Sequence, residues 1–158
     1  GRIKEAFKGC QYQLALFANH EMEGTMIHFE RILGTRVVAL PEAVDAISDP
    51  VEGLALRFAP DEVLLTTKLS YGARAELLSK DPHAIAIDEG AFSGVWLCED
   101  HALSLLENLA EWPMPSERPA FAQGSVAGLP TKLWFDEERV LFVVQTPYAH
   151  ELEERLSH

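Results

Sequence analysis

The stretch that decides the fold is residues 121–156, which read FAQGSVAGLPTKLWFDEERVLFVVQTPYAHELEERL. Two apolar runs within it, residues 126–135 and residues 140–145, have the alternation and the β-branched and aromatic content of strands. The acidic residues 136–138 separate the two runs and predict a turn. The stretch therefore predicts a β-hairpin.

A short helix is predicted directly after this hairpin. Thr146 is a good N-cap because its hydroxyl accepts a free backbone N–H, and Pro147 suits the first helical position. Tyr148, Leu152 and Leu156 follow at i, i+4 and i+8, which places them on one face of the helix.

The same pattern occurs earlier in the chain, at a constant spacing of 77 residues. The matched pairs are Leu56 and Leu133, Phe58 and Phe135, Val63 and Val140, Leu64 and Leu141, Leu65 and Phe142, and Tyr71 and Tyr148. Amphipathic hairpins share their alternation, but repeated Phe, Val, Leu and Tyr at one spacing goes beyond alternation. We therefore interpret the chain as a duplicated strand–helix–strand–strand–helix unit.

The first half contains five further predicted elements. A strand is expected over residues 10–17, and a helix carries Met22, Met26, Phe29 and Leu33 and ends at Gly34. The next predictions are a strand over 36–40, a loop over 41–53 and a hairpin over 54–59 and 63–68. The last is a helix over 71–78, which is capped by Ser70 and broken at Asp81-Pro82. Its inward-facing residues are expected to be Tyr71, Ala75 and Leu78.

The second half starts with two predicted strands, residues 84–87 and 92–98. A helix carrying Ala102, Leu105, Leu106 and Leu109 follows, and the proline-rich residues 111–119 form a connector. The fold class is therefore α+β, with antiparallel sheets and helices on one face of each, in ferredoxin-like halves. Residues 1–158 are expected to form a single compact domain whose related halves span about 10–80 and 83–158.

Composition excludes several classes of protein. A net charge of −12 argues against nucleic-acid binding, since a phosphate backbone requires clustered Lys and Arg. No apolar run approaches the roughly 20 residues that cross a bilayer, and no signal-peptide pattern opens the sequence. Cys10 and Cys98 form neither a disulfide framework nor a metal-ligand pattern, so a reduced, cytoplasmic protein is expected.

Several segments resemble a known superfamily. Asp88 ends a strand, and Trp96-Leu97-Cys98-Glu99-Asp100-His101-Ala102-Leu103-Ser104-Leu105-Leu106 opens a helix, as in the aminomethyltransferase (glycine-cleavage T-protein) superfamily. Residues 126–130 (VAGLP), Leu133-Trp134 and Tyr148-Ala149, together with residues 56–65 (LRFAPDEVLL), resemble the gamma subunit of heterotetrameric sarcosine oxidase. Glu99 stands where that family usually has Gly, and Val63 replaces its common Trp. The resemblance covers residues 54–156 by motif and residues 10–40 by element order.

The resemblance implies a T-protein-like fold and a non-catalytic accessory subunit. The expected partner is a larger folate-, flavin- or NAD-binding oxidase-type subunit, or a second copy of the chain, in a complex that oxidises N-methylated amino acids. The chain alone is expected to bind no cofactor. The alternative is a free-standing, folate-binding aminomethyltransferase-like protein, for which tetrahydrofolate is the cofactor.

The residues themselves predict no catalytic or metal site. His20, Glu21, Glu23 and His28 lack the helical spacing of zinc motifs and suit a solvated helix start. Asp100 suits a helix cap, and nothing in the sequence places a substrate beside His101 or His150.

Three other features have structural interpretations. Residues 90–94 (GAFSG) lack the G-x-S-x-G spacing of a serine-hydrolase elbow, and a turn that enters a strand is expected. Lys8-Gly9-Cys10 matches a motif of another T-protein relative by chance. Trp96, Trp112 and Trp134 are expected to anchor the core or an interface, with stacking on a pterin ring as the alternative.

Overall fold

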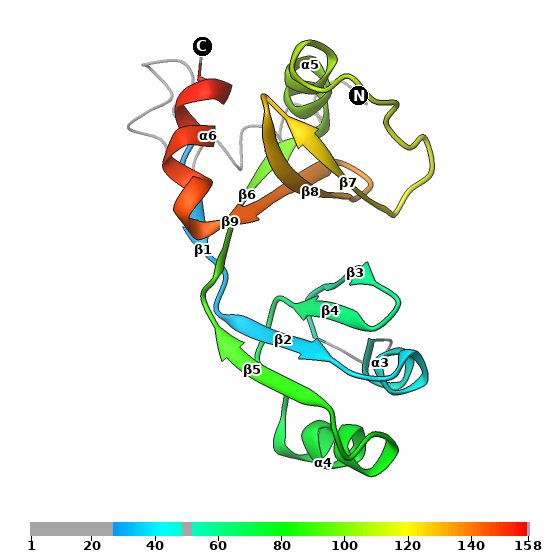
Figure 1. Ribbon diagram of the computed structural model, residues 1–158. Coiled ribbons are helices and arrows are strands. Elements are labelled where there is room, and N and C mark those ends of the chain that lie inside the picture. Colours follow the sequence, from blue (N-terminus) through cyan, green and yellow to red (C-terminus); the bar gives the residue numbers. More distant parts are fainter. Residues whose placement is uncertain (1–26, 49–51, 158) are drawn as a thin grey trace. The chain divides into compact units, whose positions relative to one another are not determined.

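The computed structural model describes residues 27–48 and 52–157. Within these ranges the chain forms two compact units, residues 31–91 and residues 27–30 with 92–157. Each unit contains one antiparallel sheet with helices packed on one face (Figure 1). The predicted α+β fold class is therefore confirmed. The single domain and its half boundaries remain a prediction.

The unit of residues 31–91 has a four-stranded sheet in the order β3-β4-β2-β5. Its elements are β2 (Gly34–Val38), α3 (Pro41–Ser48), β3 (Ala55–Ala59), β4 (Glu62–Leu65), α4 (Tyr71–Lys80) and β5 (Ile85–Glu89). Val37, Val63 and Leu65 lie on one face of the sheet and pack with Val44 of α3 and Leu77 of α4. The β3–β4 hairpin confirms the one predicted from sequence, whereas β5, predicted in the second half, pairs with β2 here.

Helix α3 was not expected, because residues 41–53 were predicted to be a loop. Pro41 occupies the first helical position, where its missing N–H costs nothing. Ala43, Val44 and Ile47 then form a buried face at helical spacing, and the Leu40 carbonyl accepts the first backbone N–H groups. Pro41 lies at the start of this helix, and Glu42 and Asp45 lie on its exposed face.

Helix α4 confirms the predicted helix and its cap, since the Ser70 hydroxyl accepts the Ala73 N–H and the helix ends at Asp81. Its predicted inward face is wrong. Tyr71 is 93% exposed and Leu78 is 49% exposed, whereas Leu77 is buried. The face of α4 that packs on the sheet therefore differs from the predicted face, because the few apolar residues of this helix do not define a single face.

The second unit has a five-stranded sheet in the order β1-β6-β9-β8-β7. Its elements are β1 (Glu30–Arg31), β6 (Phe92–Cys98), α5 (Glu99–Leu109), β7 (Ala120–Val126), β8 (Leu129–Phe135), β9 (Arg139–Gln145), the 3-10 turn η1 (Thr146–Tyr148) and α6 (Ala149–Leu156). Leu133, Phe142 and Val144 of the sheet pack with Leu106 of α5 and Leu152 of α6.

Two expectations in this unit are wrong. The run of residues 126–135 is interrupted by a two-residue turn at Ala127 and Gly128, which have φ values of 51° and 83° and join β8 to the unpredicted strand β7. Glycine tolerates this left-handed backbone, so Gly128 was a usable signal for the turn in the sequence. The helix predicted around Phe29 is replaced by β1, while residues 10–17 and 20–26 lie outside the described part.

Helices α5 and α6 confirm their predicted positions, with one exception. Leu152 and Leu156 are buried, but Tyr148 is 39% exposed and Ala149 faces inward in its place. Thr146 is not a helix cap, because its hydroxyl lies 3.0 Å from the Ser93 hydroxyl instead. The connector over residues 111–119 contains no helix or strand, as predicted.

The two units share one connectivity. β2, α3, β3, β4 and α4 follow one another in the first, and β6, α5, β8, β9 and α6 do so in the second, with β7 inserted before β8. The sheet orders correspond as β3-β4-β2 and β8-β9-β6. The order strand–helix–strand–strand–helix matches the predicted unit, but in the first unit its helix is α3 and not the helix predicted around Phe29. The matched pairs 77 residues apart lie in corresponding strands, whereas Tyr71 begins α4 and Tyr148 lies in η1, before α6. Duplication of one ancestral unit remains a prediction.

Candidate functional site

A shallow pocket lies in the unit of residues 31–91, where three segments meet. These are the connection from β2 to α3, the turn between β3 and β4, and the connection from α4 to β5. Its lining residues are Val38, Ala39, Leu40, Pro41, Pro60, Asp61, Asp81, His83 and Ile85. We name this the β2–α3 pocket.

Asp81 holds two of these segments together. It is 7% exposed, and its two carboxylate oxygens each accept a backbone N–H, one from Leu40 and one from His83, both at 2.9 Å. Leu40 immediately precedes α3, so the carboxylate also lies at the positive end of that helix. Asp81 thereby fixes the end of α4 to the start of α3.

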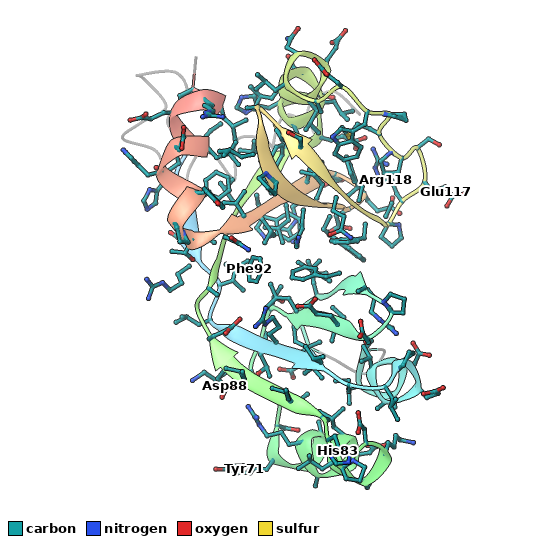
Figure 2. All side chains as sticks on the ribbon, in the orientation of Figure 1. Tyr71, His83, Asp88, Phe92, Glu117 and Arg118 are labelled. Carbon is teal, nitrogen blue, oxygen red and sulfur yellow. The ribbon has the colours of Figure 1, made fainter. Side chains whose placement is uncertain are left out.

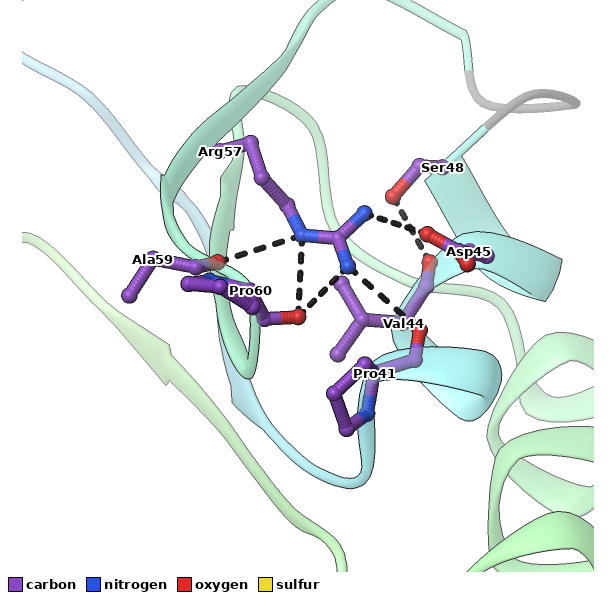
Figure 3. A network of polar contacts seen from close by, with 7 residues as sticks. All are labelled: Pro41, Val44, Asp45, Ser48, Arg57, Ala59 and Pro60. Carbon is purple, nitrogen blue, oxygen red and sulfur yellow. Dashed lines mark hydrogen bonds and ion pairs between the residues drawn. The ribbon is translucent and has the colours of Figure 1, made fainter.

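Arg57 holds the turn between β3 and β4 in place (Figure 3). Its guanidinium lies 2.7 Å from an Asp45 carboxylate oxygen on α3 and donates to the Pro41 carbonyl at 3.4 Å. It also donates to the Ala59 and Pro60 carbonyls at the end of β3, each at 3.2 Å from its Nε. The β3–β4 turn is thereby bound to the first turn of α3, and the pocket wall has a fixed shape.

The pocket surface is mainly apolar and open to solvent. Leu40 is 54% exposed, Ile85 is 53% exposed and Val38 is 36% exposed. The Asp61 side chain is exposed at the rim and makes no hydrogen bond or ion pair with any other described residue. The pocket thus combines an exposed apolar surface with an acidic rim, an arrangement that suits a binding surface.

A second polar cluster joins α4 to the sheet of the same unit. The Thr35 hydroxyl donates to Asp88 at 2.6 Å, and Arg74 forms an ion pair with the same carboxylate oxygen (Figure 2 marks Asp88). The hydrogen bond from Thr35 and then the charge of Arg74 lower the pKa of Asp88 below 3.8. Arg74 also donates to the Ala86 carbonyl, so this cluster ties α4 to the edge strand β5.

His28 and His150, two of the histidines singled out by sequence, lie beside glutamates of α6 in the described part of the chain. His28 Nδ1 lies 3.4 Å from Glu153, and His150 lies 3.7 Å from Glu153 and 3.2 Å from Glu154. Among residues 27–48 and 52–157 no group of three His, Cys, Asp or Glu side chains has metal-binding geometry. Glu153 instead accepts the Phe29 N–H at 2.7 Å, which attaches residues 28–29 to α6. His20, Glu21 and Glu23 lie outside the described residues.

Asp100 is not the cap of its helix, because α5 already begins at Glu99 and Cys98 is the residue in the capping position. His101 is half-buried, and burial lowers its pKa below 6.5 because the charged imidazolium loses solvation. Neither residue lines the β2–α3 pocket.

Two of the three tryptophans have identifiable structural partners. Trp112 donates from Nε1 to the Ser125 carbonyl at 2.8 Å and lies against Gly124, where an added Cβ would come within 2.5 Å of its ring. The Arg139 guanidinium covers the Trp96 ring at 3.8 Å, a cation–π contact. Trp134 lies in β8 opposite Leu141 of β9.

Two further sequence features have defined places. Ser93 of the GAFSG segment lies in β6 and is 3% exposed, and its hydroxyl meets Thr146. Cys98, at the end of β6, is disulfide-bonded, so the expectation of reduced cysteines is wrong for this residue. Cys10 lies outside the described residues.

No helix in the described part of the chain is long and apolar enough to span a membrane.

No protein-family model and no curated protein matches this chain. Among solved structures it is similar to a chain of the heterotetrameric sarcosine oxidase from Corynebacterium sp. U-96, in complex with pyrrole 2-carboxylate. The TM-score is 0.62 at 18% identity, over 81% of this chain and 79% of that chain. The chain therefore has a sarcosine oxidase-related fold.

The residues of the β2–α3 pocket were not identified from sequence. Asp81 was interpreted only as a helix breaker, and Asp61 only as part of a turn. Pro41 after a β-branched strand was a usable signal for the start of a helix. The exposure of Leu40 and Ile85 had no such signal, because both continue apolar strand patterns.

Proposed function

We propose that this chain is a non-catalytic accessory subunit of a complex related to heterotetrameric sarcosine oxidase, in the role of the gamma subunit. Its partner is a larger oxidase-type subunit that binds folate, flavin or NAD. The chain itself contributes structure and a binding surface, and the reaction of an N-methylated amino acid takes place on the partner.

The observation that carries the proposal is the similarity in fold to a chain of such a complex. The matched region makes up nearly equal shares of the two chains, 81% and 79%, so the two chains are similar in length. The open apolar pocket supports a role in assembly, since surfaces of this kind mark interaction sites.

Co-expression tests the proposal. The tagged chain is produced together with an oxidase-type subunit encoded beside it in the source genome, and the mass of the purified material is measured by light scattering. We expect one heteromeric species that oxidises sarcosine or a related N-methylated amino acid. An oxidase-type subunit that reaches full activity and its final mass without the chain would contradict the proposal.

Calorimetry with tetrahydrofolate tests the alternative of a free-standing folate protein. The accessory role predicts no heat of binding to the isolated chain at micromolar concentrations. Binding of tetrahydrofolate by the chain alone, in the absence of any partner, would favour the alternative.

A cytoplasmic location is also part of the proposal. Because Cys98 is disulfide-bonded in the structure and disulfides are rare in the cytoplasm, the redox state of Cys98 in cells tests this location. Alkylation of intact cells with iodoacetamide, followed by mass spectrometry, reports its redox state. A modified Cys98 thiol fits the cytoplasm, whereas a protected Cys98 that reacts only after reduction fits an oxidising compartment.

A further inference from the structure

We propose that the β2–α3 pocket is the surface by which this chain docks a protein partner, and that the partner inserts an apolar side chain flanked by Lys or Arg. The identity of the partner rests on the proposed function. The chemistry of the partner's side chains is inferred from the geometry of the pocket.

The apolar part of the pocket calls for an apolar anchor. Single exposed apolar residues are common on protein surfaces, but here they converge from separate segments. Val38 of β2 and Ile85 of β5 are directly opposite in the antiparallel register and so share one face of the sheet. Leu40 and Pro60 extend this surface across the pocket. Burying it under a partner side chain removes exposed hydrocarbon from water.

The charge at the rim selects a basic neighbour for that anchor. Asp45 is paired with Arg57, and both oxygens of Asp81 accept backbone N–H groups. Glu62, next to Asp61, lies 3.4 Å from Arg36. Asp61 is thus the carboxylate of the pocket that has no partner among the described residues. A second copy is disfavoured as the occupant, because each chain has a net charge of −12.

The pocket is held in one shape before any partner binds. Asp81 fixes the start of α3 to the end of α4, and Arg57 fixes the β3–β4 turn to α3. A preformed surface binds with a smaller entropic cost than one that must be ordered.

Pairing of a partner strand with β5 does not explain this surface. β5 is the last strand of its sheet, and exposed edges can accept strands from other proteins. However, the Ala86 carbonyl in the middle of β5 already accepts a hydrogen bond from Arg74 at 3.1 Å. Arg74 is in turn fixed by Asp88. The geometry therefore favours insertion of a side chain into the pocket over addition of a strand.

The experiment measures binding of the full chain to the co-purifying oxidase-type subunit by biolayer interferometry at low and high salt. We expect Ile85→Asp to weaken binding by about tenfold or more, as for a central apolar contact. Asp61→Asn should weaken it by about threefold at low salt and less at high salt, because a rim charge is screened. Tyr71→Asp is the matched control and should stay within about twofold, because Tyr71 is exposed at the opposite end of α4 (Figure 2).

The outcomes separate this inference from the proposed function. If the wild-type chain binds and Ile85→Asp and Asp61→Asn bind equally well, the docking surface is wrong and the proposed function stands. If the wild-type chain does not bind, the proposed function fails, and the surface is tested alone by NMR. Acetyl-Leu-Arg-amide should then shift the amide resonances of Leu40 and Ile85 more strongly than acetyl-Leu-Glu-amide. Equal or absent shifts would overturn the inference, as would a homodimer that Ile85→Asp dissociates.

Discussion

Strands β3 and β8 occupy corresponding places in the two sheets but differ in their surroundings. β3 is the edge of its sheet, whereas β8 is covered by β7. Phe58 in β3 is only partly buried, and its counterpart Phe135 in β8 is fully buried, with the Arg118 guanidinium 4.7 Å from its ring. One added strand has therefore turned an edge position into an interior one.

The edge strand is also less regular. The pairing of β3 with β4 shifts register between Arg57 and Ala59, whereas β8 pairs with β9 without interruption. Bulges are frequent at sheet edges, where an extra residue disturbs only one neighbour. In β3 the bulge lies beside Arg57, whose side chain organises the β2–α3 pocket. The irregular unit thus carries the candidate binding surface, and the regular unit carries the larger core.

Truncation of the two matched phenylalanines should show the largest difference between the units. Phe135→Ala should lower the free energy of unfolding by about 3–5 kcal/mol, because it leaves a cavity in a closed core. Phe58→Ala should cost about 1–2 kcal/mol, because part of the ring is already in water. Urea unfolding measures both, and equal losses would show that β7 does not change the environment of β8.

Each unit also has one acidic side chain that links segments through backbone N–H groups. Asp81→Ala leaves the N–H groups of Leu40 and His83 without their acceptor and should cost about 3 kcal/mol. Glu153→Ala frees one backbone N–H, that of Phe29, and removes two contacts with the exposed His28 and His150, so it should cost about 1 kcal/mol. Thermal unfolding of both variants checks the order, and a larger loss for Glu153→Ala would contradict it.

Alanine substitutions at two glycines should change the free energy of unfolding in opposite directions. Gly124→Ala places a Cβ within 2.5 Å of the Trp112 ring and should destabilise the second unit by about 1–2 kcal/mol. Gly72→Ala meets nothing within 4 Å on α4 and should stabilise the first unit by about 0.5 kcal/mol. Urea midpoints report both changes. A stabilising Gly124→Ala would mean that Trp112 does not pack on β7.

The smallest effect concerns pH and belongs to the second unit. Because the pKa of His101 lies below 6.5 in the folded chain, the unfolded chain binds the proton first as pH falls. The contribution of neutral His101 is thus present above pH 6.5 and is lost as pH falls through the folded pKa. His101→Gln should show a smaller loss of stability between about pH 7.5 and 5 than the wild-type chain, measured by urea unfolding. An unchanged pH dependence would contradict this assignment.

The sequence was sufficient for most of the elements that alternate or repeat clearly. Both hairpins and helices α4, α5 and α6 were predicted because their apolar residues recur at a period of two or near four. The connector before β7 was predicted from its three prolines. Strand β7 was missed because Ala120, Ala122 and Gly124 are too small to give an apolar signal. Helix α3 was missed because its first residue, Pro41, and its acidic residues are also common in loops.

The orientation of side chains and the candidate site were less predictable. Tyr71 and Tyr148 were expected on the inward faces of their helices because each begins a series of apolar residues at helical spacing, yet both are exposed. Spacing shows which residues share a helix face, but burial depends on how each helix lies on its sheet. The β2–α3 pocket brings together residues more than 40 positions apart, such as Leu40 and Asp81, and no local pattern encodes that contact.

The most direct test of the proposed function is the mass and composition of the species formed when this chain is co-expressed with its neighbouring oxidase-type subunit. The account predicts a stable heteromeric complex that contains the chain in fixed stoichiometry, together with an isolated chain that binds no tetrahydrofolate. A chain that purifies alone from the co-expression and binds tetrahydrofolate would contradict it.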